Sequence, residues 1–387
     1  MSVLNVPQPE FMEDEEISIF ADAVGKFYQQ HAPEKRVLKW REEGQVEREF
    51  WNEAGEAGLL GVSVPEEYGG HGGDFRHDMV VIDQQAKHGV EGFAASLHNT
   101  VILPYLVRHG TEEQKKKYLP KLVTGELVSA IAMTEPGVGS DLQSITTTAL
   151  KDGNGYRING AKTYISNGQT ADFIIIVAKT DPKERAKGIS LMLLETEGAE
   201  GFQRGKKLDK IGLDAADTSE LFFDDVFVPA ENVLGGVEGK GFYQLMGELP
   251  QERLIIAMGA MTGIEKALET TMDFVKNRKA FGQTIWDFQN TQFVMADLKA
   301  RATAARVFVN DCIAKHLKKE LSVDTACMAK YWVTELQGEV VDKCLQFHGG
   351  AGFINDYPIA RMYRDSRITR IFGGSNEVMK MVIARGM

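Results

Sequence analysis

The spacing of apolar residues changes twice along this chain of 387 residues, and that change most constrains its fold. Up to about residue 125, apolar residues recur at three- and four-residue intervals, which is typical of helices that bury one face. Near residue 128 this spacing gives way to short runs rich in apolar and β-branched residues, which favour strands. The helical spacing returns at about residue 240. The order predicts an α+β protein whose helices and strands are segregated along the chain.

The same patterns predict where individual elements lie. Five helices are expected in the first region, over residues 13–31, 46–58, 77–91, 93–109 and 111–122. In the middle region, strands are expected over 173–178, 189–194 and 221–229, and the sequence Asp-Gly-Asn-Gly at 152–155 favours a hairpin turn. The stretches 285–317 and 321–347 are longer than an average globular helix, which indicates antiparallel bundle packing.

The charge of the chain excludes one class of partner. It carries 44 basic and 55 acidic side chains, a formal net charge of −11, and its sequence pI is about 5.4. Because nucleic-acid binding requires a basic face, no nucleic-acid partner is expected. Small anions remain compatible with this charge, since they need only a local basic pocket or a helix N-terminus.

The cysteines and the apolar stretches indicate a soluble protein of a reducing compartment. Cys312, Cys327 and Cys344 form no CxxC pair and lie in helical, apolar contexts, which favours buried free thiols. No cluster has the spacing of zinc ligands. The longest apolar stretch, 254–261, is far shorter than the roughly 20 residues of a membrane span. Acidic residues near the N-terminus do not fit a targeting segment.

Four segments combine glycines with hydroxyl or charged side chains. Taken singly, each has a structural explanation as a turn, a strand end, a kink or new helix start at Pro250, or a helix C-cap. His348 alone is more typical of a structural histidine than of a ligand. The segments are Met-Thr-Glu-Pro-Gly-Val-Gly-Ser-Asp at 133–141, Tyr-Ile-Ser-Asn-Gly at 164–168, Glu-Leu-Pro-Gln-Glu-Arg-Leu at 248–254, and Phe-His-Gly-Gly at 347–350 with Phe-Gly-Gly-Ser-Asn-Glu at 372–377.

A dinucleotide-binding reading of the first segment is poor. Gly137 and Gly139 resemble the start of a GxGxxG fingerprint, but Leu142 stands where the third glycine should fall. No alternation of strands and helices, and no parallel-sheet context, is expected around them.

Together and in this order, the four segments resemble the acyl-CoA dehydrogenase family over the whole chain. The sequences ELPQERL at 248–254, ACMAKYW at 326–332 and GGSNE at 373–377 are most similar to its long-chain branch. The resemblance implies an N-terminal helical domain over 1–127, a central β-barrel-like domain over 128–238 and a C-terminal four-helix bundle over 239–387. It also implies bound FAD and a homotetramer built as a dimer of dimers. Such a protein is cytoplasmic in a bacterium or the mature form of a matrix enzyme.

The resemblance also assigns residues to the cofactor. Thr134 would hydrogen-bond the isoalloxazine, and the planar guanidinium of Arg278 would contact the FAD pyrophosphate across the dimer interface. At 164–166 the family often has Trp-Ile-Thr, and Tyr-Ile-Ser preserves the aromatic ring and the hydroxyl. The expected cofactor residues are Ile131, Met133, Thr134, Ser140, Tyr164, Ile165, Ser166, Arg278, Gln289, Gln346, Gly349, Gly350, Ser375, Asn376 and Glu377.

The reaction implied by the family is the removal of an α-proton and a β-hydride from an acyl-CoA thioester. Such chemistry needs a base and hydrogen-bond donors for the enolate oxygen. Many relatives carry the base in a C-terminal segment whose place is taken here by Gly373, which has no side chain. The long-chain and isovaleryl branches carry it on the helix that here contains Glu252. We therefore predict Glu252 as the base, with the backbone N–H of Gly373 donating to the thioester oxygen.

The remaining expectations concern the substrate site and the competing bases. Residues expected near the acyl-CoA are Ser140, Tyr243, Pro250, Gln251, Arg253, Gly373 and Gly374. Glu248 and Glu377 remain competitors for the role of the base, and Arg253 could be structural. If Glu252 is buried, desolvation should raise the pKa of its carboxyl.

The implied product is a trans-2-enoyl-CoA from a medium-to-long-chain substrate of fatty acid β-oxidation, with an electron-transferring flavoprotein as electron acceptor. Three alternatives stay open: an enzyme for branched or terpenoid acyl-CoA, an acyl-CoA or nitroalkane oxidase on the same fold, and a helical interaction protein without cofactor.

Overall fold

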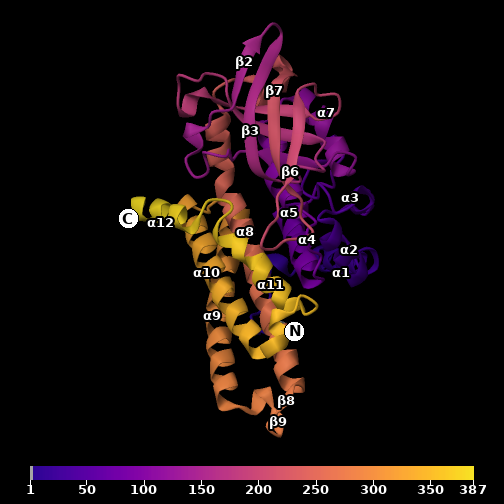
Figure 1. Cartoon of the computed structure of the whole chain (residues 1–387), viewed down its shortest axis with the longest axis vertical. Helices are drawn as coiled ribbons and strands as arrows, with labels where there is room; N and C mark the ends of the chain where they lie inside the picture. Colours follow the sequence, from indigo (N-terminus) through magenta and orange to yellow (C-terminus); the bar gives the residue numbers. More distant parts are fainter. Residues whose placement is uncertain (1–2) are drawn as a thin grey trace.

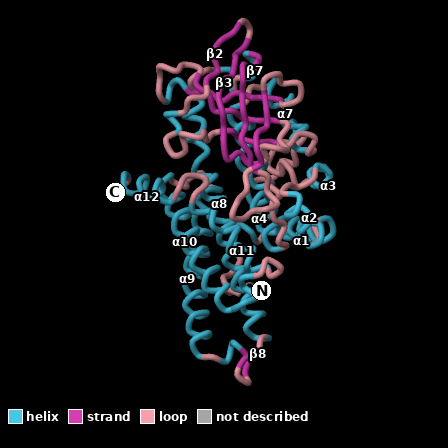
Figure 2. The backbone as a smooth tube through the Cα atoms, in the orientation of Figure 1, coloured by secondary structure: helices cyan, strands magenta, loops and turns pink. Residues whose placement is uncertain are grey.

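The computed structural model describes residues 3–387 and confirms the order of helices, strands and helices. The sheet lies at one end of an elongated molecule, and the long C-terminal helices extend from it toward the other end (Figure 1). The N-terminal helices α1 to α4 lie beside these long helices, below the sheet in this view. Figure 2 shows the same separation, with nearly all strands gathered at one end.

The N-terminal region contains the five predicted helices and one that the sequence pattern did not reveal. The unpredicted helix is α2, a helix of 10 residues that buries only Val37 and Trp40, so its apolar period is too short to stand out. The stretch 93–109 is helical in three parts, because a π-helix, η3, joins α5 to α6. The helices are α1 (Glu15–His31), α2 (Glu34–Glu43), α3 (Arg48–Glu56), α4 (Phe75–Lys87), α5 (Ala95–Leu97), η3 (His98–Ile102), α6 (Leu103–His109) and α7 (Glu112–Val123).

The middle region forms a curled, mixed seven-stranded sheet with the order β1-β4-β2-β3-β7-β6, in which β5 also pairs with β4. The predicted hairpin turn joins β2 to β3, and Gly153 there has φ +57°, which glycine adopts without strain. The prediction that a strand ends at Pro229 is confirmed. The strands are β1 (Ser129–Ala132), β2 (Thr148–Asp152), β3 (Gly155–Ser166), β4 (Phe173–Lys179), β5 (Ile189–Glu195), β6 (Phe202–Lys207) and β7 (Thr218–Pro229).

One expectation about this sheet was wrong. We expected no parallel-sheet context around Gly137, but β1, which ends just before that loop, pairs in parallel with β4 in the register Ser129↔Phe173. The chain between them forms the β2–β3 hairpin and contains no crossover α-helix. The unit therefore differs from a dinucleotide-binding βαβ unit, in which a helix connects the two parallel strands.

The C-terminal region is a helical bundle. The helix α8 runs through Pro250 without a break, so no new helix begins at this proline. The long helices α8, α9 and α10 pack on one another, and the shorter α11 packs on both α8 and α10 as the fourth member. The helices are α8 (Gly241–Asn277), α9 (Gln289–Leu317), α10 (Val323–His348), α11 (Pro358–Ser366) and α12 (Asn376–Arg385); the small hairpin of β8 (Lys279–Ala280) and β9 (Gln283–Thr284) joins α8 to α9.

Apolar packing joins the three regions into one unit. The core of the bundle takes in Leu4 and Met79 from the N-terminal region. On one face of the sheet, alternate residues of β4 and β5 pack against α6 and α7, and the other face forms a separate cluster within the β region. Because both faces of β4 are buried, its sequence is a continuous apolar run, which is why it was recognised as a strand.

The described residues also bear on disulfides, membrane spans and metal sites. The three cysteines are free and buried there, as expected. Within residues 3–387, no helix has the length and apolar character of a membrane span. Nor does any group of histidine, cysteine, aspartate and glutamate side chains in this range have the arrangement of a metal site.

Candidate active site

The carboxyl group of Glu252 lies buried where α6 packs against α8. Its Oε1 accepts a hydrogen bond of 2.9 Å from the hydroxyl of Tyr105, a side chain of α6 that is itself fully buried. Burial raises the pKa of Glu252 to about 7; the negative charge of Glu248 acts in the same direction, whereas the Tyr105 hydrogen bond and the charge of Arg253 oppose it. The expectation that burial raises this pKa agrees with the structure.

The π-helix η3 helps to align α6 with α8. Extra-wide turns of this type occur frequently at functional sites, and here the carbonyl oxygen of Thr100 accepts a hydrogen bond of 2.7 Å from Nε2 of Gln251. The Oε1 atom of the same glutamine accepts from Nη2 of Arg108 at 2.7 Å. Gln251 therefore bridges η3 and α6 and helps to hold the register in which Tyr105 meets Glu252.

The competing carboxylate Glu248 is held in an ion-pair cluster. It lies one helical turn before Glu252 and is buried, and its two oxygens contact the guanidinium of Arg108 and, at 3.0 Å, Nε2 of His109. The other competitor, Glu377, is exposed in the first turn of α12, where hydrogen bonds from its own backbone N–H and from Ser375 lower its pKa. Of the three carboxyl groups, Glu252 alone is both buried and outside an ion pair in the described chain.

The loop containing Gly373 lies against the helix that carries Glu252. Gly373 has φ +62°, and a Cβ atom at this position would overlap with Cδ1 of Ile256, one turn beyond Glu252 on α8. The fully buried Lys330 holds the loop from the other side, because its Nζ donates to the carbonyl oxygen of Gly374 at 2.8 Å and to Oδ1 of Asn376 at 2.9 Å. The structure thus brings together the two positions that were predicted to be catalytic.

The first two segments predicted to contact the cofactor lie side by side on the sheet. The backbone N–H of Thr163 donates to the carbonyl oxygen of Thr134 at 2.9 Å, which ties the loop after β1 to β3. Lys162 strengthens the same junction, since its Nζ donates to the carbonyl oxygen of Met133 at 2.9 Å and to Oε1 of Glu135 at 3.0 Å. Next to it, Tyr164 has φ +60° at an irregularity of β3, and its side chain is 68% exposed.

The remaining expected cofactor residues divide into two groups. Ser375, Asn376 and Glu377 lie at the start of α12, beside the Gly373 loop, whereas Arg278, Gln289, Gln346, Gly349 and Gly350 lie at the opposite end of the long helices. Arg278 follows the last residue of α8, 26 residues after Glu252, which at 1.5 Å per residue corresponds to about 39 Å along the helix. Gln289 begins α9, and Gln346 to Gly350 end α10 at the same end of the bundle, near β8 in Figure 1. All of these far-end residues except the partly buried Phe347 and the buried His348 are exposed. One chain therefore does not bring them together with Thr134.

The residues predicted to contact the substrate differ in burial. Tyr243 at the start of α8 and Ser140 after β1 are exposed. Arg253 is buried, with Nη1 donating to Sγ of Cys327 at 3.2 Å, and its Nε has no hydrogen-bond partner in the described part of the chain. Gln251 is occupied by protein contacts, so Arg253 and Gln251 support the site from within.

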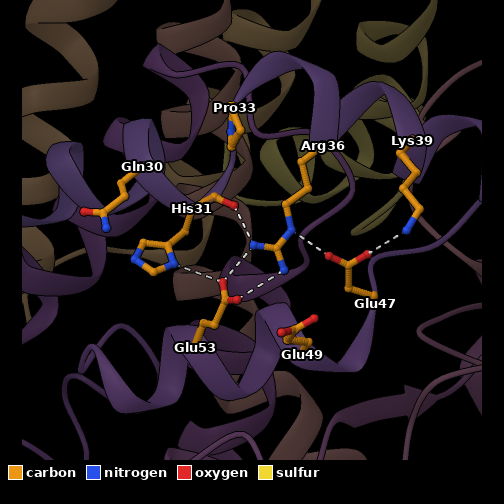
Figure 3. Close-up of a pocket in the computed structure, with 8 residues that line it drawn as sticks. All are labelled: Gln30, His31, Pro33, Arg36, Lys39, Glu47, Glu49 and Glu53. Carbon is orange, nitrogen blue, oxygen red and sulfur yellow. Dashed lines mark hydrogen bonds and ion pairs between the residues drawn. The ribbon is translucent and has the colours of Figure 1, made fainter.

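A cavity of about 390 Å³ lies elsewhere, among α1, α2 and α3 (Figure 3). Several of its charged side chains pair with one another: Arg36 donates to Glu47 at 2.6 Å and to Glu53 at 2.8 Å, and His31 lies 3.1 Å from Glu53. It has no part in the cluster around Glu252, and most of its charged side chains pair with one another.

The raised pKa of Glu252 predicts a pH effect on stability. The folded protein binds this proton more tightly than the unfolded chain, whose glutamate has a pKa near 4.5, so stability falls as the pH rises from about 4.5 through about 7. The parent is therefore expected to lose about 3 kcal/mol of stability from this group between pH 4.5 and pH 8, and E252Q, which cannot ionise, should lack this loss. Unfolding in denaturant at pH 4.5 and 8 tests this. Equal pH dependence of the two proteins would contradict it.

Three family models cover nearly the whole chain. They are described as the acyl-CoA dehydrogenase N-terminal domain, matched over residues 14–126, the middle domain over 130–226 and the C-terminal domain over 239–387. The long-chain specific acyl-CoA dehydrogenase of Sus scrofa is 47% identical over 96% of this chain and 86% of that protein. The isovaleryl-CoA dehydrogenase of Pongo abelii is 40% identical over 94% of this chain and 86% of that protein.

Solved structures agree with these matches. An acyl-CoA dehydrogenase from Geobacillus kaustophilus is 46% identical, with a TM-score of 0.94 over 96% of this chain and 98% of that one. A glutaryl-CoA dehydrogenase from Mycobacterium smegmatis in complex with FADH2 is 25% identical, with a TM-score of 0.89 over 98% of this chain and 96% of that one. With all three domains matched in order, the chain belongs to the acyl-CoA dehydrogenase family.

Proposed function

We propose that this enzyme uses FAD to convert a medium-to-long-chain acyl-CoA into the trans-2-enoyl-CoA, with Glu252 as the base. The observation that carries the proposal is the buried carboxyl of Glu252 beside the Gly373 loop. A base with a pKa of about 7 is half ionised near neutral pH, where it can accept a proton and later release it.

The protein groups have separate roles in this reaction. Glu252 takes the α-proton of the thioester, the electrons of the broken C–H bond form the new double bond, and the β-hydrogen leaves as hydride. The backbone N–H of Gly373 donates to the thioester oxygen, where negative charge develops; one such donor is typically worth about 2.7–4 kcal/mol in the transition state. Lys330 keeps the loop in place through the carbonyl oxygen of Gly374. When bound, FAD supplies the acceptor for the hydride.

The residues present fit FAD if two chains contribute to each site. Thr134, Tyr164 and Ser166 offer polar groups and an exposed ring. They belong to the sheet region, which lies toward the end of the molecule where α8, the helix of Glu252, begins. At the far end, Arg278 is exposed and forms no ion pair within residues 3–387, and the space around Gly349 and Gly350 is open to a ligand. Because these groups lie far apart in one chain, the partner chain's far end would complete the site, as a homotetramer built as a dimer of dimers allows.

The long-chain assignment rests on the segments ELPQERL, ACMAKYW and GGSNE and on the greater identity to a long-chain enzyme than to the isovaleryl-CoA enzyme compared. It places the enzyme in fatty acid β-oxidation, with an electron-transferring flavoprotein as electron acceptor. A branched-chain substrate is the second candidate, because isovaleryl-CoA dehydrogenases are also relatives. An oxidase on the same fold would pass its electrons to oxygen instead.

Anaerobic titration of the purified enzyme with straight and branched acyl-CoA from C4 to C18 tests the proposal. We expect flavin absorbance in the purified protein and bleaching that is fastest with a straight medium or long chain. Fastest bleaching with a branched chain would favour the second candidate. Rapid peroxide formation in air without an added acceptor would indicate an oxidase, and a colourless protein that rejects added FAD would contradict the proposal.

A further inference from the structure

Successive turns of α6 contact successive turns of α8. Tyr105 contacts Glu252, and one turn later on α6, Arg108 and His109 contact Glu248, which lies one turn earlier on α8. The two helices therefore run in opposite directions here, and each turn of α6 meets one carboxyl group of α8. Both carboxyl groups are buried, so their interactions are only weakly screened by solvent.

We propose that Tyr105 and Glu248 are positioning residues that act on the base in opposite directions, Tyr105 favouring its ionised form and Glu248 its protonated form. This inference rests on the proposed function, because it takes Glu252 to be the base. It extends that function to α6, which carries none of the residues predicted from the sequence motifs.

Tyr105 acts through its hydroxyl group. Its ring and hydroxyl are buried, and burial together with the charge of Glu252 keeps its pKa far above the ordinary value, so the hydroxyl stays protonated as a donor. A donor to a carboxylate stabilises the ionised form. The bond engages Oε1 alone, and no hydrogen bond joins Oε2 to another described residue, so Oε2 is left for the proton of the substrate.

Glu248 acts through its charge. Ionised and one turn away, it opposes a second negative charge on Glu252. Arg108 compensates part of this charge, but its own side chain is 46% exposed, so solvent weakens that compensation. His109 contacts Glu248 directly, and His316 of α9 lies close enough to interact with the charge of Glu248. The charged groups that face Glu252 itself are Glu248 and Arg253, together with the neutral Tyr105.

The test is the pH dependence of flavin reduction by acyl-CoA in single-turnover experiments. In the parent, the rate should rise with pH through about 7. Y105F removes only the donor and is expected to shift this rise upward by about one pH unit, whereas E248Q removes only the charge and is expected to shift it downward by a similar amount. R108Q removes the cation that partly compensates Glu248, so the rate of flavin reduction should rise at a higher pH than in the parent. This variant keeps the effect of the charge testable if E248Q does not fold.

Matched variants separate this effect from a general loss of structure. Y118F removes a buried tyrosine hydroxyl of α7 that bonds Glu195, and E265Q removes an ion-paired carboxylate of α8 that bonds Arg306. Neither should move the pH profile. The carbonyl stretch of the protonated Glu252, isolated in infrared difference spectra by subtraction of E252Q, should titrate with the same opposite shifts without any turnover.

The outcomes are distinguishable. If E252Q still reduces flavin at near the parent rate, the proposed base is wrong. If E252Q is inactive but Y105F and E248Q titrate like the parent, or shift in the same direction, Glu252 stays the base and the opposing roles of Tyr105 and Glu248 are wrong.

Discussion

E252Q is expected to lower the rate of flavin reduction by acyl-CoA by about 10²–10⁴-fold, the usual contribution of a positioned base. Glutamine has nearly the same shape as glutamate and can still accept the hydrogen bond from Tyr105, so the packing of α6 on α8 should survive. It cannot take the α-proton. Rapid mixing without oxygen, followed at the flavin absorbance, measures this rate, and FAD content and the acyl-CoA binding constant should stay close to those of the parent.

E265Q serves as the control, because it changes a partly buried glutamate of the same helix that lies outside the site. The space left at Gly373 offers a second comparison. G373E alone should not restore activity to E252Q, since φ is +62° and the new Cβ would overlap with Ile256. Adding I256A removes the overlap and should improve activity only in part, because the backbone strain remains. Bleaching of E252Q at near the parent rate would remove Glu252 from the mechanism.

K162M is expected to lower the free energy of unfolding by about 3–5 kcal/mol, the usual cost of breaking a buried ion pair. The Lys162 and Glu135 side chains are 0% and 2% exposed. Although burial opposes its charge, Glu135 keeps a pKa of about 2, because Lys162 and hydrogen bonds from Thr146 and Thr147 stabilise the carboxylate. Methionine would leave that charge buried without its cation. Equilibrium unfolding in denaturant gives the difference.

The matched control for K162M is R157M, on the same strand. Arg157 pairs with Asp152 at 2.8 Å, but the two side chains are 39% and 53% exposed, and such a pair contributes about 1 kcal/mol or less. The double variant K162M/E135Q should recover part of the lost stability, since it removes the unpaired charge. A K162M cost no greater than that of R157M would contradict this role of the buried pair. FAD retention should fall in K162M as well, because Lys162 also holds the carbonyl oxygen of Met133.

The general fold could be predicted because apolar spacing is a local signal. In runs such as 173–178 and 285–317, the burial pattern is visible within a few residues or helical turns. The parallel pairing of β1 with β4 could not be predicted, because β1 is only four residues long and its partner lies 44 residues away in the register Ser129↔Phe173. For the same reason α2, with two buried apolar residues, gave no clear period.

Some residues of the candidate site could be predicted from the sequence, and others are visible only in the fold. Glu252 and the Gly373 loop were predicted from short motifs, and the structure brings them close together. Tyr105 is separated from Glu252 by 147 residues and lies in no motif, so only the packing of α6 on α8 reveals it. Lys162 lies in none of the quoted motifs, and Lys330 lies in ACMAKYW, but nothing in the sequence indicates that both side chains are fully buried. Arg278 was placed at FAD by resemblance, and the fold explains why a second chain would be needed.

Hydrogen exchange at the α-carbon of a substrate analogue isolates the proton transfer that is assigned to Glu252. A 3-thia-acyl-CoA has sulfur in place of the β-carbon, so it can lose an α-proton but no β-hydride. Incubated with the FAD-loaded enzyme in D₂O, it should exchange its α-hydrogen rapidly with the parent and with E265Q, and at least about 10²-fold more slowly with E252Q. Mass spectrometry of the recovered thioester measures the exchange. Exchange by E252Q at the parent rate would show that another group removes the proton.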